Sequence, residues 1–326
     1  MKRLLLAAAL LLSVAAGQPW RRDLPAGIAA PPVPADNPMR EARVELGRRL
    51  FYDADLSANG TMACATCHEQ KRGFADGNET RPGVHGDPGR RNVPGLANIG
   101  WFSHLTFADP HLTTLEAQVL VPLLGEHPVE MGMKGLEAEL ERRLGADRCY
   151  RRMFARAFPE RRGRIDLPAV TAALAAFERT MISFGSPYDR FTAGDRVALT
   201  PLARQGARLF EKAGCAACHS GRLLTDMDYH RLEPAKAGDP GLIERTGRAE
   251  DAGRFRTPSL RNIALTGPWW HDGTARTLEA AVQRHGIAVA DKDMPSLIAF
   301  LESLTDPHFI ADPRLSMPDR ACGRRL

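Results

Sequence analysis

Two short cysteine motifs constrain this 326-residue chain more than any other feature of its sequence. Residues 64–68 read Cys-Ala-Thr-Cys-His, and residues 215–219 read Cys-Ala-Ala-Cys-His. This C-x-x-C-H spacing is typical of c-type haem attachment, in which two thiols bind the vinyl groups of one haem and the adjacent histidine binds its iron. The motifs therefore predict two covalently bound c-type haems. The residues expected to hold them are Cys64, Cys67, His68, Cys215, Cys218 and His219.

The surrounding sequence disfavours two other uses of a C-x-x-C pair. Structural zinc usually takes a second pair of Cys or His at short spacing, and neither motif has another cysteine nearby. A thioredoxin-like pair follows a strand, whereas the first motif follows the turn-like residues 57–61. The remaining cysteines, Cys149 and Cys322, either pair in an oxidising compartment or stay free, and the sequence leaves both states open.

The first 17 residues have the pattern of a secretory signal peptide. Lys2 and Arg3 precede an apolar stretch over 4–14 that is too short to span a bilayer, and small residues follow at 15–17. We therefore expect a periplasmic protein, the compartment that c-type haem attachment also implies. No later stretch is long and apolar enough to cross a membrane. The formal net charge of +5 is weakly basic and gives no argument for binding nucleic acid.

Several short strings occur twice, in the same order, in the two halves of the chain. Gly-x-Arg-Leu-Phe precedes each haem motif, an Arg-Asn pair follows it, and Thr-Leu-Glu-Ala comes last. The paired positions are 47–51 with 206–210, 91–93 with 261–263, and 114–119 with 277–282. One such repeat could arise by chance, but the shared order indicates a duplicated haem module.

The expected fold is mainly α, with two cytochrome-c-like haem domains related by duplication and long loops around the haems. We predict a Pro- and Ala-rich linker over 18–37, an N-terminal haem domain over 38–184 and a C-terminal haem domain over 185–326.

Four helices are expected within these domains. They cover Pro38 to about Asp53 with Asn37 as N-cap, residues 167–184, a helix opened by Thr200-Pro201, and about 294–304. The second should present an apolar stripe to the core, formed by Val170, Leu174, Phe177 and Met181.

With both motifs placed, the chain resembles the bacterial di-haem cytochrome c peroxidase family, which includes the MauG-like branch. The resemblance covers about residues 40–305. It is carried by Leu-Phe-Tyr-Asp at 50–53, Gly-Phe-Ala-Asp-Gly at 73–77, Pro-Val-Glu-Met-Gly at 128–132, Ala-Phe-Glu-Arg-Thr at 176–180, Thr-Pro-Ser-Leu-Arg-Asn at 257–262 and His-Asp-Gly at 271–273. It implies that the N-terminal haem cleaves peroxide, while the C-terminal haem receives electrons and passes them on.

The resemblance also implies a peroxide pocket lined by Gln118, Pro122 and Glu130. Cleavage of hydrogen peroxide moves one proton from the iron-bound oxygen to the departing oxygen, and a carboxylate near the haem can act first as base and then as acid. Glu130 is the expected acid–base residue and Gln118 is expected to orient the peroxide. The interval between them is two residues longer than usual in the family, so Glu126 is the alternative carboxylate.

Two further histidines match places where family members carry iron ligands. His85 lies where many peroxidases have a histidine on a mobile loop that caps the peroxidatic iron. His285 lies where peroxidases carry Met and MauG carries Tyr, which implies two imidazoles on the C-terminal iron and a lower reduction potential. If the register is shifted, His285 is an unliganded surface residue and Met294 is the ligand.

The resemblance implies a Ca²⁺ ion between the domains, held by the side chain of Asn92 and the backbone carbonyls of Thr266 and Pro268. Phe107 stands near the place where the family usually has a Trp between the haems. Trp269 and Trp270 are interpreted as haem packing. The remaining histidines are interpreted as ordinary polar residues, including His104, His111, His127, His230 and His308.

The leading hypothesis is a periplasmic peroxidase that reduces hydrogen peroxide to water with electrons from a small c-type cytochrome or copper protein. A second is a MauG-like enzyme that oxidatively modifies a partner protein, which the non-Met ligand and the Gly-Glu-His-Pro insertion at 125–128 favour. A third is a non-enzymatic electron carrier, against which the Gln118 and Glu130 pocket argues. Family peroxidases commonly form homodimers, and the sequence leaves the oligomeric state open.

Overall fold

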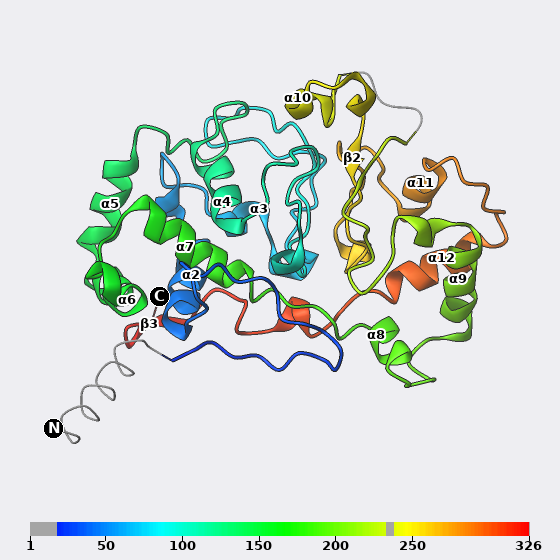
Figure 1. Ribbon diagram of the computed structural model, residues 1–326, viewed down its shortest axis with the longest axis horizontal. Helices are drawn as coiled ribbons and strands as arrows, with labels where there is room; N and C mark the ends of the chain where they lie inside the picture. The colour runs from blue at the N-terminus through cyan, green and yellow to red at the C-terminus, as the bar shows by residue number, and fades with distance from the viewer. Residues whose placement is uncertain (1–17, 233–237, 326) are drawn as a thin grey trace.

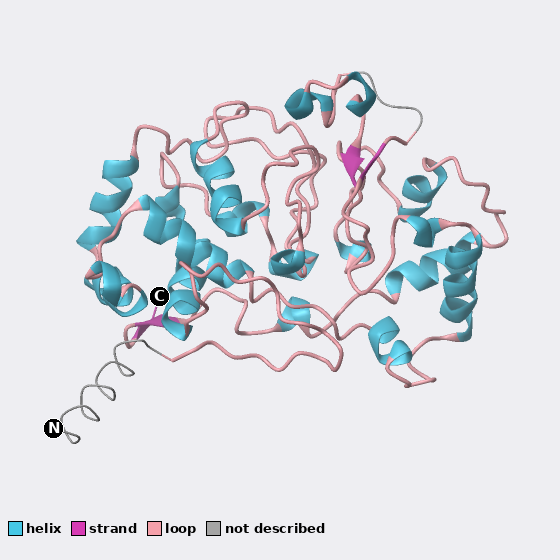
Figure 2. Ribbon diagram, in the orientation of Figure 1, coloured by secondary structure: helices cyan, strands magenta, loops and turns pink. Residues whose placement is uncertain are grey.

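The computed structural model describes residues 18–232 and 238–325, so the predicted signal peptide at 1–17 lies outside the described residues. Two groups of helices lie side by side, connected by long loops (Figures 1 and 2). Two-stranded ladders and isolated bridges are the only β-structure in the described part of the chain. The prediction of a mainly α fold with long loops is confirmed.

The regular elements follow the chain in this order. The α-helices of the first half are α2 (Glu41–Phe51), α3 (Cys64–Cys67), α4 (Leu115–Leu124), α5 (Glu137–Ala146), α6 (Arg148–Ala157) and α7 (Leu167–Glu178). Those of the second half are α8 (Pro187–Thr192), α9 (Pro201–Lys212), α10 (Ile243–Thr246), α11 (Leu278–Gln283) and α12 (Met294–Glu302). The 3-10 turns are η1 (Ala54–Leu56), η2 (Gln70–Arg72), η3 (Ile99–Trp101), η4 (Pro159–Arg161), η5 (Cys215–Ala217), η6 (Ala249–Asp251), η7 (Ile263–Leu265) and η8 (Phe309–Ala311). Strand β1 (Tyr229–His230) pairs antiparallel with β2 (Phe255–Arg256), and β3 (Arg320–Ala321) with β4 (Arg324–Arg325).

A pair of closely packed helices forms the centre of each half, and each pair depends on one glycine. In the first half α2 packs on α7, and in the second α9 packs on α12 (Figure 1). A Cβ atom on Gly47 would overlap the carbonyl oxygen of Ala173, and one on Gly206 would overlap that of Ser296. Only glycine lets two backbones approach so closely. The equivalent contact in both halves supports the predicted duplication.

The Gly47→Ala variant should therefore be clearly less stable than the parent protein. Its methyl group would force α2 away from α7, and overpacking of a core typically costs about 1–3 kcal/mol or more. We expect a lower free energy of unfolding in chemical denaturation of the haem-loaded protein. The matched control is Gly145→Ala in α5, where an added Cβ meets nothing within 4 Å. That change should be neutral or stabilising, since alanine favours helix over glycine by about 1 kcal/mol. Equal unfolding midpoints for the two variants would contradict the contact.

The predicted N-cap of the first helix is wrong. Helix α2 begins at Glu41 with Arg40 as its N-cap, which makes no side-chain capping bond, and it ends at Phe51. Asn37 instead holds two distant segments together. Its amide nitrogen donates to Glu116 (2.6 Å) and to the Ala172 carbonyl (2.9 Å). These tertiary contacts outcompete the capping role that the sequence pattern suggested.

Helix α7 confirms the predicted apolar stripe but ends six residues early, at Glu178. Val170, Leu174, Phe177 and Met181 are all fully buried. The chain then leaves the helix because its backbone pairs with Asn98. The Asn98 N–H donates to the Met181 carbonyl (2.7 Å), and its side chain accepts from the Ser183 N–H (2.8 Å).

The internal repeat also needs one correction. Asn262, which precedes η7, has left-handed backbone angles (φ 58°, ψ 23°), and its structural counterpart is Asn98 before η3 (φ 60°, ψ 23°). Both side chains bind Ser183. The predicted pairing of the Arg-Asn strings at 91–93 and 261–263 is therefore wrong. The other two pairs of strings are equivalent in the structure. One contains the glycine contact described above, and in the other Thr114 caps α4 as Thr277 caps α11.

After α12 the chain returns to the first half of the molecule (Figure 1). Phe309 and Leu315 belong to the same buried cluster as Phe74. The Cys149 and Cys322 thiols, whose state the sequence left open, form a disulfide that ties this returning segment to α6. The two ends of the described chain thus both lie against the N-terminal haem module.

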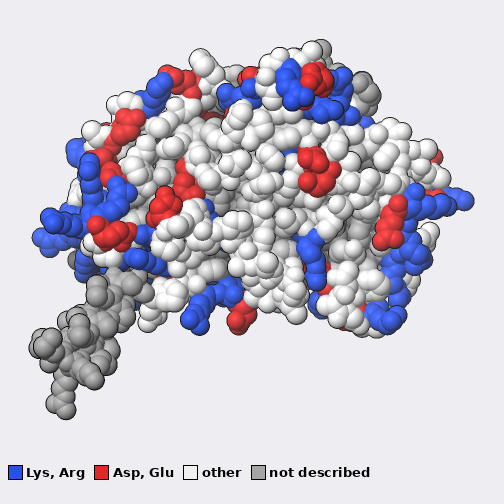
Figure 3. All heavy atoms as spheres, viewed as in Figure 1, with Lys and Arg blue, Asp and Glu red and all other residues white. Residues whose placement is uncertain are grey.

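Charged side chains of both signs are spread over the surface. In Figure 3, Lys and Arg gather near α6 at the left end, while the centre of that face carries few charges. Across residues 18–232 and 238–325, no helix combines the length and the apolar character that a membrane crossing needs.

Candidate haem sites and peroxide pocket

The first haem motif is built to present His68. The short helix α3 carries Cys64 and Cys67, and the Thr66 hydroxyl accepts from the Ala63 N–H (2.9 Å) at its start. The His68 Nδ1 atom lies 2.6 Å from the Phe74 carbonyl oxygen, so it donates its proton there and leaves Nε2 free for a metal. Burial lowers the pKa of His68, which keeps the imidazole neutral as a ligand must be.

The second motif repeats this arrangement. The Nδ1 atom of His219 lies 3.3 Å from the Leu224 carbonyl oxygen, again leaving Nε2 free. Burial, and secondly the neighbouring His285, lower the pKa of His219 to about 4. The turn η5 holds Cys215, and Cys218 follows it directly.

His285 lies opposite His219, with ring centres 6.3 Å apart. Its Nδ1 atom lies 2.8 Å from the Ala281 carbonyl oxygen, so its Nε2 is also free. Imidazole nitrogens bind metals at about 2 Å, so two imidazoles on opposite sides of one iron place their ring centres roughly 6 Å apart. The observed spacing fits an iron between them. Met294, the alternative ligand, is buried at the start of α12.

One cavity of about 310 Å³ contains both imidazoles and both cysteines of the second motif. Its wall is largely apolar, as a haem requires, with Phe210, Ile263, Leu278, Val282 and Leu297 among its residues. The Met294 side chain is not part of this wall, whereas Phe107, Trp269 and Trp270 are. The residues present therefore fit a c-type haem between His219 and His285.

The segments that carry the predicted peroxide-pocket residues meet at the end of α4. Gln118 and Pro122 lie one helical turn apart, and the Met131 N–H donates to the Pro122 carbonyl oxygen (2.9 Å). The Met133 N–H donates to the Leu123 carbonyl oxygen (2.8 Å), so the segment that follows Glu130 is held against the last turn of α4.

Glu130 has the properties expected of an acid–base group. Burial raises its pKa. Its charge also acts on the first haem motif, because it adds to the burial that raises the pKa of Cys67 to about 11. Among the residues that the structure describes, neither the Glu130 carboxylate nor the Gln118 amide has a hydrogen-bond partner, so both are available to a ligand. Glu126, the alternative, is exposed and forms an ion pair with Lys134.

The loop that carries His85 is seated on the Glu130 segment. The Val84 N–H donates to the Glu130 carbonyl oxygen (2.7 Å), and a Cβ atom on Gly83 would overlap the Val129 carbonyl oxygen. The His85 side chain is exposed, and its Nε2 atom lies 3.3 Å from the point where a Cβ on Gly132 would stand. The structure thus places His85 beside the segment that carries Glu130.

Two of the three residues expected to bind Ca²⁺ lie in the wall of the cavity at the second haem motif. The Asn92 amide nitrogen donates to the carbonyls of Asn78 (2.9 Å) and Glu79 (3.3 Å), which turns its side-chain oxygen away from them. Asn92 and Thr266 both line the cavity, and Pro268 follows two residues later after a cis peptide bond. Oxygen donors suit Ca²⁺.

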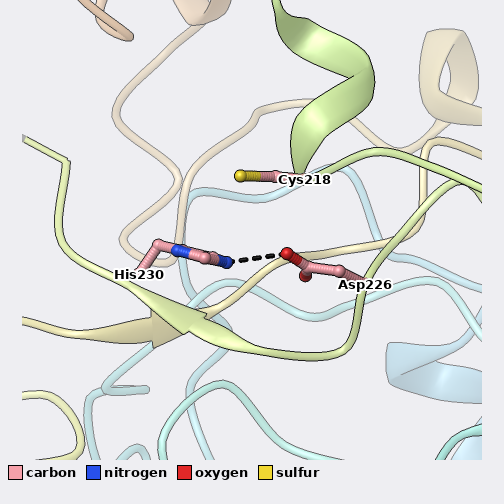
Figure 4. Close-up of side chains that lie close together, drawn as sticks. All are labelled: Cys218, Asp226 and His230. Carbon is pink, nitrogen blue, oxygen red and sulfur yellow. Dashed lines mark hydrogen bonds and ion pairs between the residues drawn. The ribbon is translucent and has the colours of Figure 1, made fainter.

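Sequence reasoning missed a polar group at the edge of the second haem site (Figure 4). The His230 Nε2 atom lies 2.7 Å from an Asp226 carboxylate oxygen, and both lie within 4.8 Å of the Cys218 sulfur. Cys, His and Asp are metal ligands, but haem attachment already uses Cys218. The i to i+4 spacing is a helical signal, whereas His230 lies on strand β1, so no sequence pattern pointed to this pair.

Two other buried titratable residues gained no role from the sequence. His271 lies in the cavity wall and stacks on Phe255, with ring centres 3.7 Å apart and planes 12° apart. Glu178 is buried on α7, and burial raises its pKa to about 8. Both belong to strings that carried the family resemblance, but only the structure shows that they are buried.

Comparison with known proteins agrees with this architecture. Residues 41–197 match the profile of the family described as di-haem cytochrome c peroxidase, and residues 203–305 match the cytochrome c profile. The methylamine utilization protein MauG of Methylophilus methylotrophus is 34% identical over 84% of this chain and 85% of its own length. Cytochrome c551 peroxidase of Pseudomonas aeruginosa is 32% identical over 86% of this chain and 82% of its own.

The solved structures include a MauG-like protein associated with microbial copper homeostasis. It is 40% identical, superposes with a TM-score of 0.87, and covers 92% of this chain and 100% of its own. The chain belongs to the di-haem cytochrome c peroxidase family. It is a di-haem enzyme of the peroxidase type with two c-type haems, as the motifs predicted.

Proposed function

We propose that this chain is a periplasmic peroxidase that reduces hydrogen peroxide to water with electrons from a small c-type cytochrome or copper protein. The observation that carries this proposal is the Glu130 carboxyl group. It is partly buried, its charge acts on Cys67 of the first haem motif, burial raises its pKa, and it is free of hydrogen bonds from the described residues. An electron carrier has no use for such a group.

In the reaction H₂O₂ + 2H⁺ + 2e⁻ → 2H₂O, three residues of the N-terminal module would have separate roles. His68 would hold the N-terminal haem, whose iron would supply the binding site for peroxide. Glu130 takes a proton from the near oxygen of the peroxide and returns it to the far oxygen, which departs as water when the O–O bond breaks. The Gln118 amide, on the same side of α4 as Pro122, orients the peroxide by hydrogen bonding.

His219 and His285 would hold the C-terminal haem, which would supply the entry point for electrons from the donor. We propose that a Ca²⁺ ion at the domain border is bound by the Asn92 side-chain oxygen and the carbonyls of Thr266 and Pro268, and that it fixes the relative position of the two haem modules. His85 is proposed as a cap on the peroxidatic iron. The homodimer expected from the family stays a prediction.

A second candidate is a MauG-like enzyme that oxidises a partner protein. The position of His285 opposite His219 favours this second candidate. Two imidazole ligands would make the C-terminal haem a weaker acceptor of electrons from an ordinary cytochrome. The structural relative at 40% identity is also described as MauG-like. Phe107 at the domain border counts against it, because phenylalanine is harder to oxidise than tryptophan.

Peroxide turnover by the haem-loaded protein separates the two candidates. Reduced small cytochrome c serves as donor, and the assay is run before and after pre-reduction of the enzyme. We expect donor oxidation that depends on both peroxide and enzyme, and a requirement for pre-reduction if His85 caps the iron. A long-lived spectral change on adding peroxide without donor oxidation would overturn the peroxidase proposal in favour of the second candidate.

A further inference from the structure

Arg256 is a buried cation that lacks an anion. It lies on strand β2, its side chain packs over the Phe102 ring, and the residue is 3% exposed. Its Nε donates to the Thr106 carbonyl oxygen (3.1 Å), and one terminal nitrogen, Nη1, donates to the Thr257 carbonyl oxygen (3.0 Å) and to the Met227 sulfur (3.7 Å). The other, Nη2, makes no hydrogen bond within residues 18–232 and 238–325, and no described carboxylate pairs with the guanidinium.

Within the described part of the chain, the other buried arginines all have carboxylate partners. Arg261 pairs with Asp189 at 2.5 Å, and both terminal nitrogens of Arg179 bind Glu116 at 2.8 Å. Burying an unpaired charge is costly, and burial lowers the pKa of Arg256 to about 10. Arg256 is thus a buried cation that finds no counter-charge among residues 18–232 and 238–325.

The missing anion belongs in the cavity of the second haem. Arg256 lines the same cavity as His219 and His285. The Trp270 indole N–H, a second buried donor that finds no partner among the described residues, lies in the wall of that cavity too. A c-type haem brings two propionate carboxylates, which accept hydrogen bonds from such donors.

Arg256 also stands at the border between the two haem modules. Its backbone N–H donates to the Phe107 carbonyl oxygen (2.8 Å), and its Nε reaches Thr106, so two of its bonds go to the N-terminal module. A charge at this place acts on electrons that pass between the haems.

We propose that Arg256 binds a propionate carboxylate of the C-terminal haem and thereby raises the reduction potential of that haem. A fixed cation favours the reduced iron, which carries one positive charge less. This offsets the lowering that a second imidazole from His285 produces. The inference rests on haem attachment at Cys215 and Cys218 and not on the substrate of the enzyme, so a failure of the peroxidase assay leaves it intact.

Potentiometric titration of the C-terminal haem tests the proposal in the haem-loaded protein. We expect R256Q to weaken reduction of this haem by a one-electron donor at least tenfold, a potential shift of 59 mV to lower values. R256K, which keeps the charge, should retain most of the potential. The matched control M227L changes a contact of the guanidinium but not its charge, and its potential should match the parent.

Two results would overturn the assignment. One is an R256Q protein with intact haem and an unchanged low-spin spectrum whose reduction equilibrium differs less than twofold from the parent. The other is an M227L shift as large as that of R256Q, which would make packing the cause. If R256Q cannot be obtained with its haem bound, resonance Raman spectra of the parent protein and of R256K test the contact with the propionate instead. The propionate bending band should move when an ammonium replaces the guanidinium, and an identical band would refute the contact.

Discussion

Replacing Glu130 by glutamine should reduce peroxide turnover by roughly 10²–10⁴-fold, the range over which a positioned acid–base group acts. Glutamine keeps the size of the side chain but cannot carry the proton between the two peroxide oxygens. Since the Glu130 side chain makes no hydrogen bond to any described residue, haem content and unfolding should be unchanged. The measurement is kcat with a reduced small cytochrome as donor, together with the haem absorption per protein.

The matched control for this variant is Glu126→Gln. Glu126 is exposed, and its charge is engaged by Lys134, so turnover should stay within about twofold of the parent, the scale of context effects at surface positions. An activity loss in E126Q rather than E130Q would show that the longer interval after Gln118 shifts the catalytic carboxylate to Glu126.

The pH dependence follows from the raised pKa of Glu130. A base must be ionised to accept a proton, so turnover should fall as the pH drops through the pKa of this group. Burial raises that pKa, which places the fall at a higher pH than an ordinary glutamate would give. The acid limb should be absent from the residual activity of E130Q.

Replacing His285 by alanine should abolish the low-spin spectrum of the C-terminal haem. The 6.3 Å spacing of the His219 and His285 rings fits two imidazoles on one iron, as proposed, so removal of His285 would leave that iron with one protein ligand. Electron paramagnetic resonance of the oxidised protein measures the change directly. Donor-dependent turnover should fall with it, while the spectrum of the N-terminal haem stays the same.

Two companion variants sharpen this test. His285→Met substitutes the thioether that many peroxidases use and should raise the reduction potential of the C-terminal haem. His111→Ala removes an exposed histidine and should change neither spectrum nor potential. A low-spin spectrum that survives in H285A would show that another residue, with Met294 the first candidate, binds the iron.

The haem residues could be predicted from the sequence because their chemistry is local. Two thiols and a histidine within five residues must reach one haem, whatever the rest of the chain does. The helix pairs were also foreseeable in part, since Gly47 and Gly206 stand at the same place in repeated strings. The structure adds the reason, which is that each glycine faces the backbone of a partner helix.

The helix boundaries that the sequence predicted wrongly are determined by contacts between residues distant in the chain. Asn37 fits a capping pattern, yet Glu116 and Ala172 engage its side chain. Helix α7 ends at Glu178, just before the backbone of residues 181–183 that Asn98 binds, and no local signal marks that position. Arg256 could not be singled out either, since its significance lies in a missing partner, which only the packed structure reveals.

The most direct test of the account is a single turnover of the enzyme with its C-terminal haem reduced. Stopped-flow mixing with one equivalent of hydrogen peroxide, without oxygen, follows the reduced absorption bands of that haem. The account predicts their loss at a rate proportional to peroxide concentration in the parent, with strong slowing in E130Q at unchanged haem content. Oxidation of the C-terminal haem at the same rate in both proteins would contradict the claim that peroxide is cleaved in the Glu130 pocket.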